Sequence, residues 1–184
     1  CERRHARALA NQARLDHLTG LPNRLALLEH LEQRREAGEP VAVLFVDIDN
    51  LKIVNDGLGH AEGDALLVSV AQTLRATTRA VDAGARLGGD EFGLLLPETD
   101  AAEAEALLQR LRSEILAAMA TRGWRVGVSI GAATFLAPPV PIDEMMARAD
   151  ELMYAAKREE KGSIRLGTFR GPAFAALESA VAPR

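Results

Sequence analysis

The chain has 184 residues, of which 48% are hydrophobic and only 4% aromatic, so one domain with a core of aliphatic side chains is expected. Its formal net charge of -4, with acids and bases mixed along the chain, excludes the basic stripe of a nucleic-acid-binding protein. The single cysteine, Cys1, excludes an internal disulfide and fits a reducing compartment, while the apolar runs are too short to span a bilayer.

The first predicted elements are two helices separated by a turn. Residues 1–15 are basic, Ala-rich and free of Gly and Pro, which favours a connecting helix outside the core. A turn at 19–23 follows, and its Pro22 suits the first position of a helix. That second helix is expected to run to about Ala37 and to end at Gly38. Because the chain begins without an initiator Met, we interpret it as a piece of a longer protein.

The middle of the chain predicts a buried strand, a helix and a hairpin. The unbroken apolar run 41–46 is typical of a strand buried on both faces, and it leads into Asp47-Ile48-Asp49. After a polar, glycine-containing stretch, residues 61–79 predict a helix. Two short strands, at 82–87 and 92–96, flank Gly88-Gly89-Asp90-Glu91 and predict an antiparallel hairpin.

The remaining elements are a helix at about 100–121, a strand at 126–135, an amphipathic helix from Ile142 to Ala156 and a short strand at 164–166. The methionines within 145–153 favour core packing over a cofactor site. Helices that alternate with strands, together with the hairpin, predict an α+β (mixed α/β) fold. We expect a central, mostly antiparallel sheet surrounded by helices.

Two groups of acidic residues are the candidates for a metal-binding or catalytic site. Asp47 follows the buried strand, where side chains of an open sheet gather around ligands, and Asp90 follows two glycines that leave room for a phosphate-sized group. If the strand lies beside the hairpin, the two carboxylates converge and repel unless a cation lies between them or one is protonated. Such oxygen ligands suit Mg²⁺. Taken alone, the Gly-Gly-Asp-Glu stretch would more simply be a solvated turn.

The segment between the two acidic groups has the composition of a nucleotide-binding loop. Its glycines and amides could wrap a nucleotide, with Lys52 near the phosphates. Two of its residues have an equally good structural interpretation. Asp64 could cap a helix, and His60 could be a structural hydrogen-bonding residue.

Together these motifs resemble a GGDEF domain, the catalytic unit of bacterial diguanylate cyclases. The matching blocks, in chain order, are 16–24, 47–52, 55–56, 59–60, 63–64, the signature 88–92, and 149–150 with 154–157. The resemblance covers about residues 15–166, and the family fold is similar to the palm of adenylyl cyclases and polymerases. It implies a connecting signalling helix at 1–15, a GGDEF diguanylate cyclase domain at 16–167 and a C-terminal tail at 168–184.

The resemblance also implies roles for individual residues. Mg²⁺ (or Mn²⁺) would be bound by Asp47, the main-chain carbonyl of Ile48, and Asp90. Asp90 would also help to deprotonate the 3′-hydroxyl of GTP, Glu91 would support the metal or the turn, and Lys52 would steady charge on the triphosphate. The implied substrate-binding residues are Asn55, His60, Asp64, Gly88, Gly89, Lys157 and Lys161. At Lys161 the chain departs from the Gly-Arg-Asn that is frequent in the family, although the positive charge is kept.

A second feature is Arg79-Ala-Val-Asp82, which lies just before the hairpin. It matches the RxxD site through which the family is inhibited by its own product, and Arg110 could complete that site. Arginine offers a planar fork to phosphate or guanine, and aspartate accepts from guanine N–H groups. The structural alternative is an exposed charge pair at a helix end.

The implied function is a diguanylate cyclase that condenses two GTP into cyclic di-GMP and two pyrophosphates, as a homodimer joined to an upstream sensor domain. GTP and cyclic di-GMP are the expected ligands, and no binding of nucleic acid is expected. The domain is expected to lie in the cytoplasm, and the longer protein could attach it to the membrane. A catalytically silent module that binds GTP or cyclic di-GMP is the alternative. A cyclase that makes a mixed adenine–guanine product is a third reading, disfavoured by Asp64.

Overall fold

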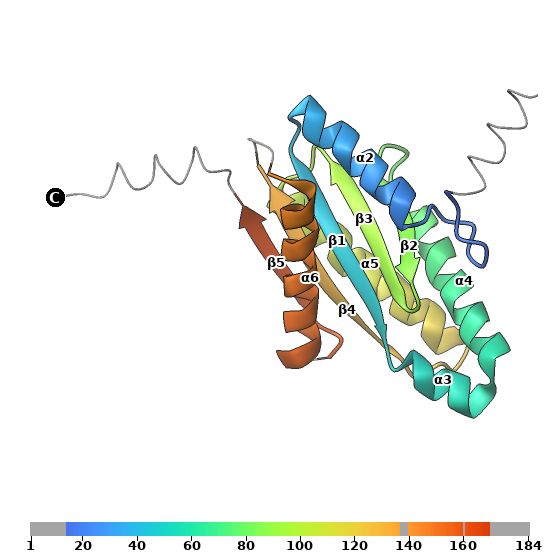
Figure 1. Ribbon diagram of the computed structural model, residues 1–184. Helices are drawn as coiled ribbons and strands as arrows, with labels where there is room; N and C mark the ends of the chain where they lie inside the picture. The colour runs from blue at the N-terminus through green and yellow to red at the C-terminus, as the bar shows by residue number, and fades with distance from the viewer. Residues whose placement is uncertain (1–13, 137–139, 160, 170–184) are drawn as a thin grey trace, which may run out of the picture.

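The computed structural model describes residues 14–136, 140–159 and 161–169 of the chain, and a central five-stranded sheet organises them (Figure 1). In chain order the strands are β1 (Val41–Asp49), β2 (Ala83–Gly88), β3 (Glu91–Pro97), β4 (Gly127–Phe135) and β5 (Ile164–Phe169). Their order across the sheet is β2-β3-β1-β4-β5. The β1–β3, β1–β4 and β2–β3 pairs are antiparallel and the β4–β5 pair is parallel. The mostly antiparallel sheet expected from the sequence is confirmed.

Helices cover both faces of this sheet. They are α2 (Arg24–Ala37), α3 (Leu51–Leu58), α4 (His60–Thr77), α5 (Ala101–Thr121) and α6 (Ile142–Glu159). Figure 1 shows α2 and α6 on one face, with α5 behind the strands on the other. Among the described residues, no helix is both long enough and apolar enough to cross a membrane.

The central strand β1 contributes to two separate cores. All of its residues are buried, and successive side chains point to opposite faces, as the pleat of a strand requires. Leu44 and Val46 pack with α4 and α5, whereas Val43 and Phe45 pack with α2 and α6. Both layers therefore hold β1 in register. Because Asp47 and Asp49 alternate with Val46 and Ile48, their side chains lie on the α6 side.

Most predicted boundaries agree with the structure. Helix α2 ends at Ala37, with Gly38 in the left-handed conformation at φ 69°, as a C-terminal glycine cap requires. The helix predicted at 61–79 runs from His60 to Thr77. The buried methionines of α6 belong to the core, as expected. The connecting helix predicted for 1–15 lies almost entirely outside the described residues.

Two elements differ from the sequence prediction. The stretch before α4 was not expected to be helical because of its glycines and polar residues, yet residues 51–58, half of them apolar, form α3, which buries Val54. The last strand continues two residues past Gly167 to Phe169, whose ring stacks on Phe135 with the centroids 5.4 Å apart. In both cases tertiary packing outweighs the local signal.

An ionic turn joins the segment before α2 to the hairpin. Asp16 Oδ1 accepts hydrogen bonds from Thr19 N at 2.8 Å, from Thr19 Oγ1 at 2.7 Å and from Arg86 Nη1 at 3.2 Å. Burial opposes ionisation of this carboxyl, but the bonds from Thr19 and Arg86 outweigh it and hold the pKa of Asp16 below its ordinary value. The ionised form is therefore favoured by folding.

Asp16→Asn is expected to lower the free energy of unfolding by about 2 kcal/mol at neutral pH, because hydrogen bonds to a charged group are lost. A lowered native pKa contributes stability above the unfolded pKa, about 3.9, and that contribution disappears as the pH falls through the native pKa. Urea unfolding of the two proteins at pH 7 and pH 3 measures this difference. A gap that did not narrow between pH 7 and pH 3, or one equal to that of the exposed Asp143→Asn, would contradict the assignment.

Candidate active site

The site is centred on Asp47, a buried carboxylate near the end of β1. Its register partners are Glu91 on β3 and Ser129 on β4, so these three side chains lie on one face of the sheet. The side chain of Asp47 is only 3% exposed, and its Oδ2 lies 2.9 Å from Lys157 Nζ on α6. Its other oxygen, Oδ1, is buried and has no hydrogen-bond partner among the described residues. One of the two oxygens of this carboxylate is therefore still able to accept a hydrogen bond or to bind a cation.

The electrostatics of this pair favour a positively charged ligand. Burial raises the pKa of Asp47; Lys157 opposes that shift, and the nearby carboxylates of Asp90 and Asp49 add to it. For Lys157, burial lowers the pKa, but the bond to Asp47 and the surrounding acids outweigh it and raise the pKa above the ordinary lysine value. Three carboxylates thus act on the one ammonium group that contacts Asp47, and a cation beside Asp47 would be stabilised by them.

The glycine turn brings Asp90 beside the end of β1. Gly88 and Gly89 have φ of 151° and 48°, values in the region that favours glycine, and both are exposed. The backbone N–H of Ile48 donates to the carbonyl oxygen of Asp90 at 3.1 Å, which fixes the turn against β1. The structure therefore brings together the carboxylate-bearing residues Asp47 and Asp90, as the sequence predicted.

Asp90 borders a cleft of about 350 Å³ between the hairpin and α3. The cleft is lined by Leu51, Lys52, Asn55, Leu67, Arg86, Gly89 and Asp90. Arg86 was not singled out from the sequence. Its guanidinium donates to the carbonyl oxygen of Gly89 through Nη2 at 2.8 Å and Nε at 3.2 Å, and it also bonds Asp16. One arginine therefore holds both the glycine turn and the segment before α2.

Asn55 lies directly over the glycine of the next helix. A Cβ placed on Gly63 would lie only 1.9 Å from Asn55 Oδ1, so the absence of a side chain at 63 creates the space that the amide occupies. Asp64 and His60 are both exposed on α4. The N-cap position of α4 belongs to Gly59, so the capping interpretation of Asp64 is wrong.

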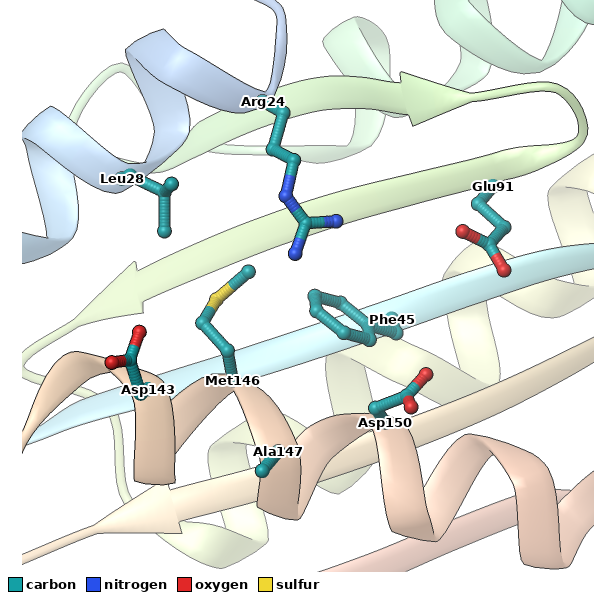
Figure 2. Close-up of a pocket in the computed structure, with 8 residues that line it drawn as sticks. All are labelled: Arg24, Leu28, Phe45, Glu91, Asp143, Met146, Ala147 and Asp150. Atoms are coloured by element: carbon teal, nitrogen blue, oxygen red, sulfur yellow. The ribbon is translucent and has the colours of Figure 1, made fainter.

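Glu91 borders a different hollow from Asp90. This hollow has a volume of about 480 Å³ and is lined by residues of α2 and α6. Figure 2 shows Glu91 at one end of it, Phe45 on the strand beneath and Arg24 pointing in from α2. Acidic side chains of α6, Asp143 and Asp150, face it from the other side. Glu91 is the strand partner of Asp47 and can influence that carboxylate, but it does not line the α3 cleft that Asp90 borders.

The predicted metal ligands fit a divalent cation. Within the described ranges, no three Asp, Glu, His or Cys side chains form a metal-binding group on their own. The predicted set contains two carboxylates and one backbone carbonyl, which leaves positions for water or phosphate oxygens, as Mg²⁺ requires. Among the described residues, Asp47 and Asp49 each have a buried Oδ1 without a hydrogen-bond partner, and that of Asp47, a predicted ligand, is the oxygen that such an ion would satisfy.

Two residues of the predicted product site, Arg79 and Asp82, are joined by a salt bridge, the charge pair given as the structural alternative. Arg79 Nη2 lies 2.9 Å from Asp82 Oδ1 and also donates to Thr99 Oγ1 at 2.8 Å. Arg110 Nη2 donates to the carbonyl oxygen of Thr77 at 2.8 Å. Arg79 and Arg110 both line a pocket of about 300 Å³ beside α5, so the two arginines do lie close together.

Comparison with known proteins agrees with this geometry. The family model described as diguanylate cyclase, GGDEF domain, matches residues 13–163 of the chain. The chain belongs to the GGDEF family. Its five-stranded sheet and surrounding helices are those of other GGDEF domains, and the family's diguanylate cyclases are generally metal-dependent.

Several GGDEF proteins are similar to this one. The diguanylate cyclase TpbB of Pseudomonas aeruginosa is 41% identical over 176 residues, which are 90% of this chain and 40% of TpbB. MucR of the same species, a bifunctional diguanylate cyclase and cyclic di-GMP phosphodiesterase, is 41% identical over 157 residues, 82% of this chain and 23% of MucR. The chain therefore spans less than half the length of these relatives.

A solved structure gives the same result for the fold. The coiled coil and GGDEF domain of DgcB from Caulobacter crescentus, in complex with c-di-GMP, superposes with a TM-score of 0.79 at 28% identity. The match covers 90% of this chain and 91% of the DgcB chain.

Proposed function

We propose that this GGDEF domain is an active diguanylate cyclase that joins two GTP molecules into cyclic di-GMP and releases two pyrophosphates. The observation that carries the proposal is the meeting of Asp47 and Asp90 where β1 reaches the glycine turn. Asp90 borders a cleft that also contains Lys52 and Asn55. A buried carboxylate with one unsatisfied oxygen, a second carboxylate and a lysine are the groups that metal-assisted phosphoryl transfer needs.

The guanine base is proposed to bind at Asn55 and Asp64, with His60 nearby. A carboxylate accepts hydrogen bonds from the N1–H and 2-amino groups of guanine, groups that adenine lacks. This chemistry favours GTP over ATP and a product with two guanines. Asn55 lines the cleft and is held over Gly63, so the space above that glycine governs the position of the amide.

Gly63→Ala is expected to weaken GTP binding by about tenfold, because the new methyl group must displace Asn55 and costs at least one good hydrogen bond. The matched control is Gly57→Ala on α3, where a Cβ meets no atom within 4 Å. Both changes favour the helix by up to about 1 kcal/mol, so neither should unfold the protein. Calorimetric titration with a non-hydrolysable GTP analogue compares them, and equal affinities would contradict the placement of Asn55.

The triphosphate is proposed to lie between the glycine turn and the end of α6. Gly88 and Gly89 expose backbone that a phosphate can approach, and Lys52, Lys157 and Lys161 supply positive charge. Lys52 borders the cleft and Lys161 is exposed in the turn after α6. Lys157 is proposed to exchange its contact with Asp47 for one with phosphate when substrate binds.

Asp47, the carbonyl oxygen of Ile48, and Asp90 are proposed to hold Mg²⁺ or Mn²⁺. When bound, such an ion would neutralise phosphate charge and make the 3′-hydroxyl of GTP easier to deprotonate. Asp90 would accept that proton, and Glu91 would support the metal site from its position opposite Asp47. Each 3′-oxygen then forms a bond to the α-phosphorus of the other GTP, and the bond to pyrophosphate breaks.

Two domains are needed for this reaction, because each cleft is proposed to hold one GTP and the two nucleotides must react with each other. Alignment of hydroxyl and phosphate across the two domains would account for most of the rate. We therefore propose a homodimer whose geometry is set by a connecting helix at 1–15 and an upstream sensor, with residues 168–184 as a tail. Arg79, Asp82 and Arg110 are proposed to bind the product and inhibit the enzyme.

Synthesis of cyclic di-GMP from GTP and Mg²⁺ tests the proposal. The protein is fused to a dimerising segment, and the product is detected by mass spectrometry across protein concentrations. Cyclic di-GMP formation that rises steeply with dimer content is expected. GTP binding without any product, at protein concentrations that favour the dimer, would contradict the cyclase assignment and leave a silent binding module.

A further inference from the structure

The last residue of β1, Asp49, makes contacts that the proposed chemistry does not use. It is 3% exposed, and its Oδ2 accepts from Ser129 Oγ at 2.7 Å and from the backbone N–H of Gly162 at 3.1 Å. Ser129 Oγ also accepts from Gly162 N at 3.1 Å. Three segments distant in sequence therefore meet at one buried carboxylate.

The peptide that Asp49 holds is fixed from its other side as well. Gly162 has φ of 81°, a conformation that favours glycine, and its carbonyl oxygen accepts from Arg112 Nε of α5 at 2.7 Å. The next residue, Ser163, donates from Oγ to the carbonyl oxygen of Ala156 at 3.1 Å. Because Ala156 precedes Lys157 on α6, this network ties the turn after α6 to the helical turn that carries Lys157.

Two carboxylates on the same face of β1 therefore hold the C-terminal end of α6. Asp47 does so through Lys157 Nζ, and Asp49 does so through the turn at Gly162. In the proposed function the first contact is broken, because Asp47 binds a cation and Lys157 moves to the triphosphate. The second contact, to Ser129 and Gly162, uses no group proposed to bind substrate, so nothing in the proposed exchange requires it to break.

We propose that Asp49, together with Ser129, is a positioning residue that keeps the end of α6 in place and so presents Lys157 to the triphosphate. This inference rests on the proposed function, in which Lys157 binds phosphate. The two neighbouring acids then have different roles. Asp47 belongs to the reacting centre, and Asp49 holds the end of the helix that carries Lys157.

The test compares nucleotide affinities rather than turnover. Calorimetry gives the affinity of the dimeric protein for a non-hydrolysable GTP analogue and for guanosine, which lacks phosphate. Asp49→Ala is expected to weaken analogue binding by about tenfold and guanosine binding by less than about twofold. Asp49→Asn retains an oxygen that can accept from Ser129 and Gly162, and is expected to restore most of the loss.

A mutant cycle shows whether Asp49 acts through the lysines at the end of α6. In a background that carries both Lys157→Ala and Lys161→Ala, Asp49→Ala is expected to have little further effect on analogue affinity, because the phosphate-binding side chains that the Gly162 turn positions are gone. Equal losses for both ligands, or losses that simply add, would overturn the proposal and leave a role in stability alone. If Asp49→Ala does not fold, Ser129→Ala or a substitution of the partly exposed Arg112, Arg112→Ala, loosens the same turn. The affinities for the analogue and for guanosine are then compared in those variants.

Failure of the inference can be told apart from failure of the proposed function. If the unmodified protein binds the analogue and Asp49→Ala binds it equally well, only the role of Asp49 is overturned. If the unmodified protein binds no analogue, the proposed function fails and the role of Asp49 fails with it. Hydrogen exchange of the Gly162 amide, measured without nucleotide, is expected to be faster in Asp49→Ala than in the unmodified protein.

Discussion

Asp90→Asn is expected to lower the kcat for cyclic di-GMP synthesis by about a thousandfold or more, with a much smaller change in GTP affinity. The substitution keeps the shape of the side chain but removes the charge that is proposed to hold the metal ion and accept the proton. Asp90 lies in a partly exposed turn anchored by its own backbone carbonyl, so the fold should survive. Product formation and calorimetric GTP binding, measured on the same dimeric protein, separate the two effects.

The matched control for this variant is Asp143→Asn, which removes an exposed carboxylate at the start of α6. It should leave both kcat and GTP affinity within about twofold, because an exposed charge that does not line the cleft of Asp90 has little influence in water. If Asp90→Asn retained more than a tenth of the activity, the carboxylate would not be essential, and the proposed role of the glycine turn would have to be abandoned.

Gly131→Ala is expected to lower the free energy of unfolding by about 3 kcal/mol, which is at the upper end for overpacked cores. Gly131 lies in the middle of β4, directly under α6. A Cβ at this position would lie 2.0 Å from the backbone nitrogen of Met153 and 2.6 Å from the carbonyl oxygen of Ala149. Both atoms belong to the backbone of α6, so the whole helix, and Lys157 with it, must move away from the sheet.

Urea unfolding measures this change, with Gly84→Ala on β2 as the control. A Cβ at Gly84 meets no atom within 4 Å, so that variant should differ from the unmodified protein by no more than about 1 kcal/mol. Equal unfolding midpoints for the two variants would show that α6 does not lie as close to β4 as the structure places it.

The fold was largely predictable because its elements carry strong local signals. The continuous apolar run of β1, the glycine turn of the hairpin and the glycine that ends α2 each specify a structure within a few residues. Helix α3 was missed although Leu51, Val54 and Leu58 stand at helical spacing, because Gly57 interrupts a segment of only eight residues and because packing of Val54 on the core contributes to its stability. Local propensity is a weak guide where tertiary contacts decide.

The candidate site was predictable only in part. The convergence of Asp47 and Asp90 follows from the adjacency of a buried strand and a hairpin, which the sequence pattern indicates. The contacts of Asp49 do not follow from any local pattern, because its partners Ser129 and Gly162 lie 80 and 113 positions away. Arg86 was missed because its partner Asp16 is 70 positions distant and because its bond to the carbonyl oxygen of Gly89 depends on the geometry of the turn.

Anomalous X-ray diffraction from crystals of the protein with Mn²⁺ and a non-hydrolysable GTP analogue tests the central claim most directly. The account predicts a manganese peak in contact with the carboxylates of Asp47 and Asp90, with phosphate oxygens completing the coordination and Lys157 turned from Asp47 towards the triphosphate. A nucleotide bound with its phosphates away from the end of β1, or manganese bound without Asp47, would contradict it.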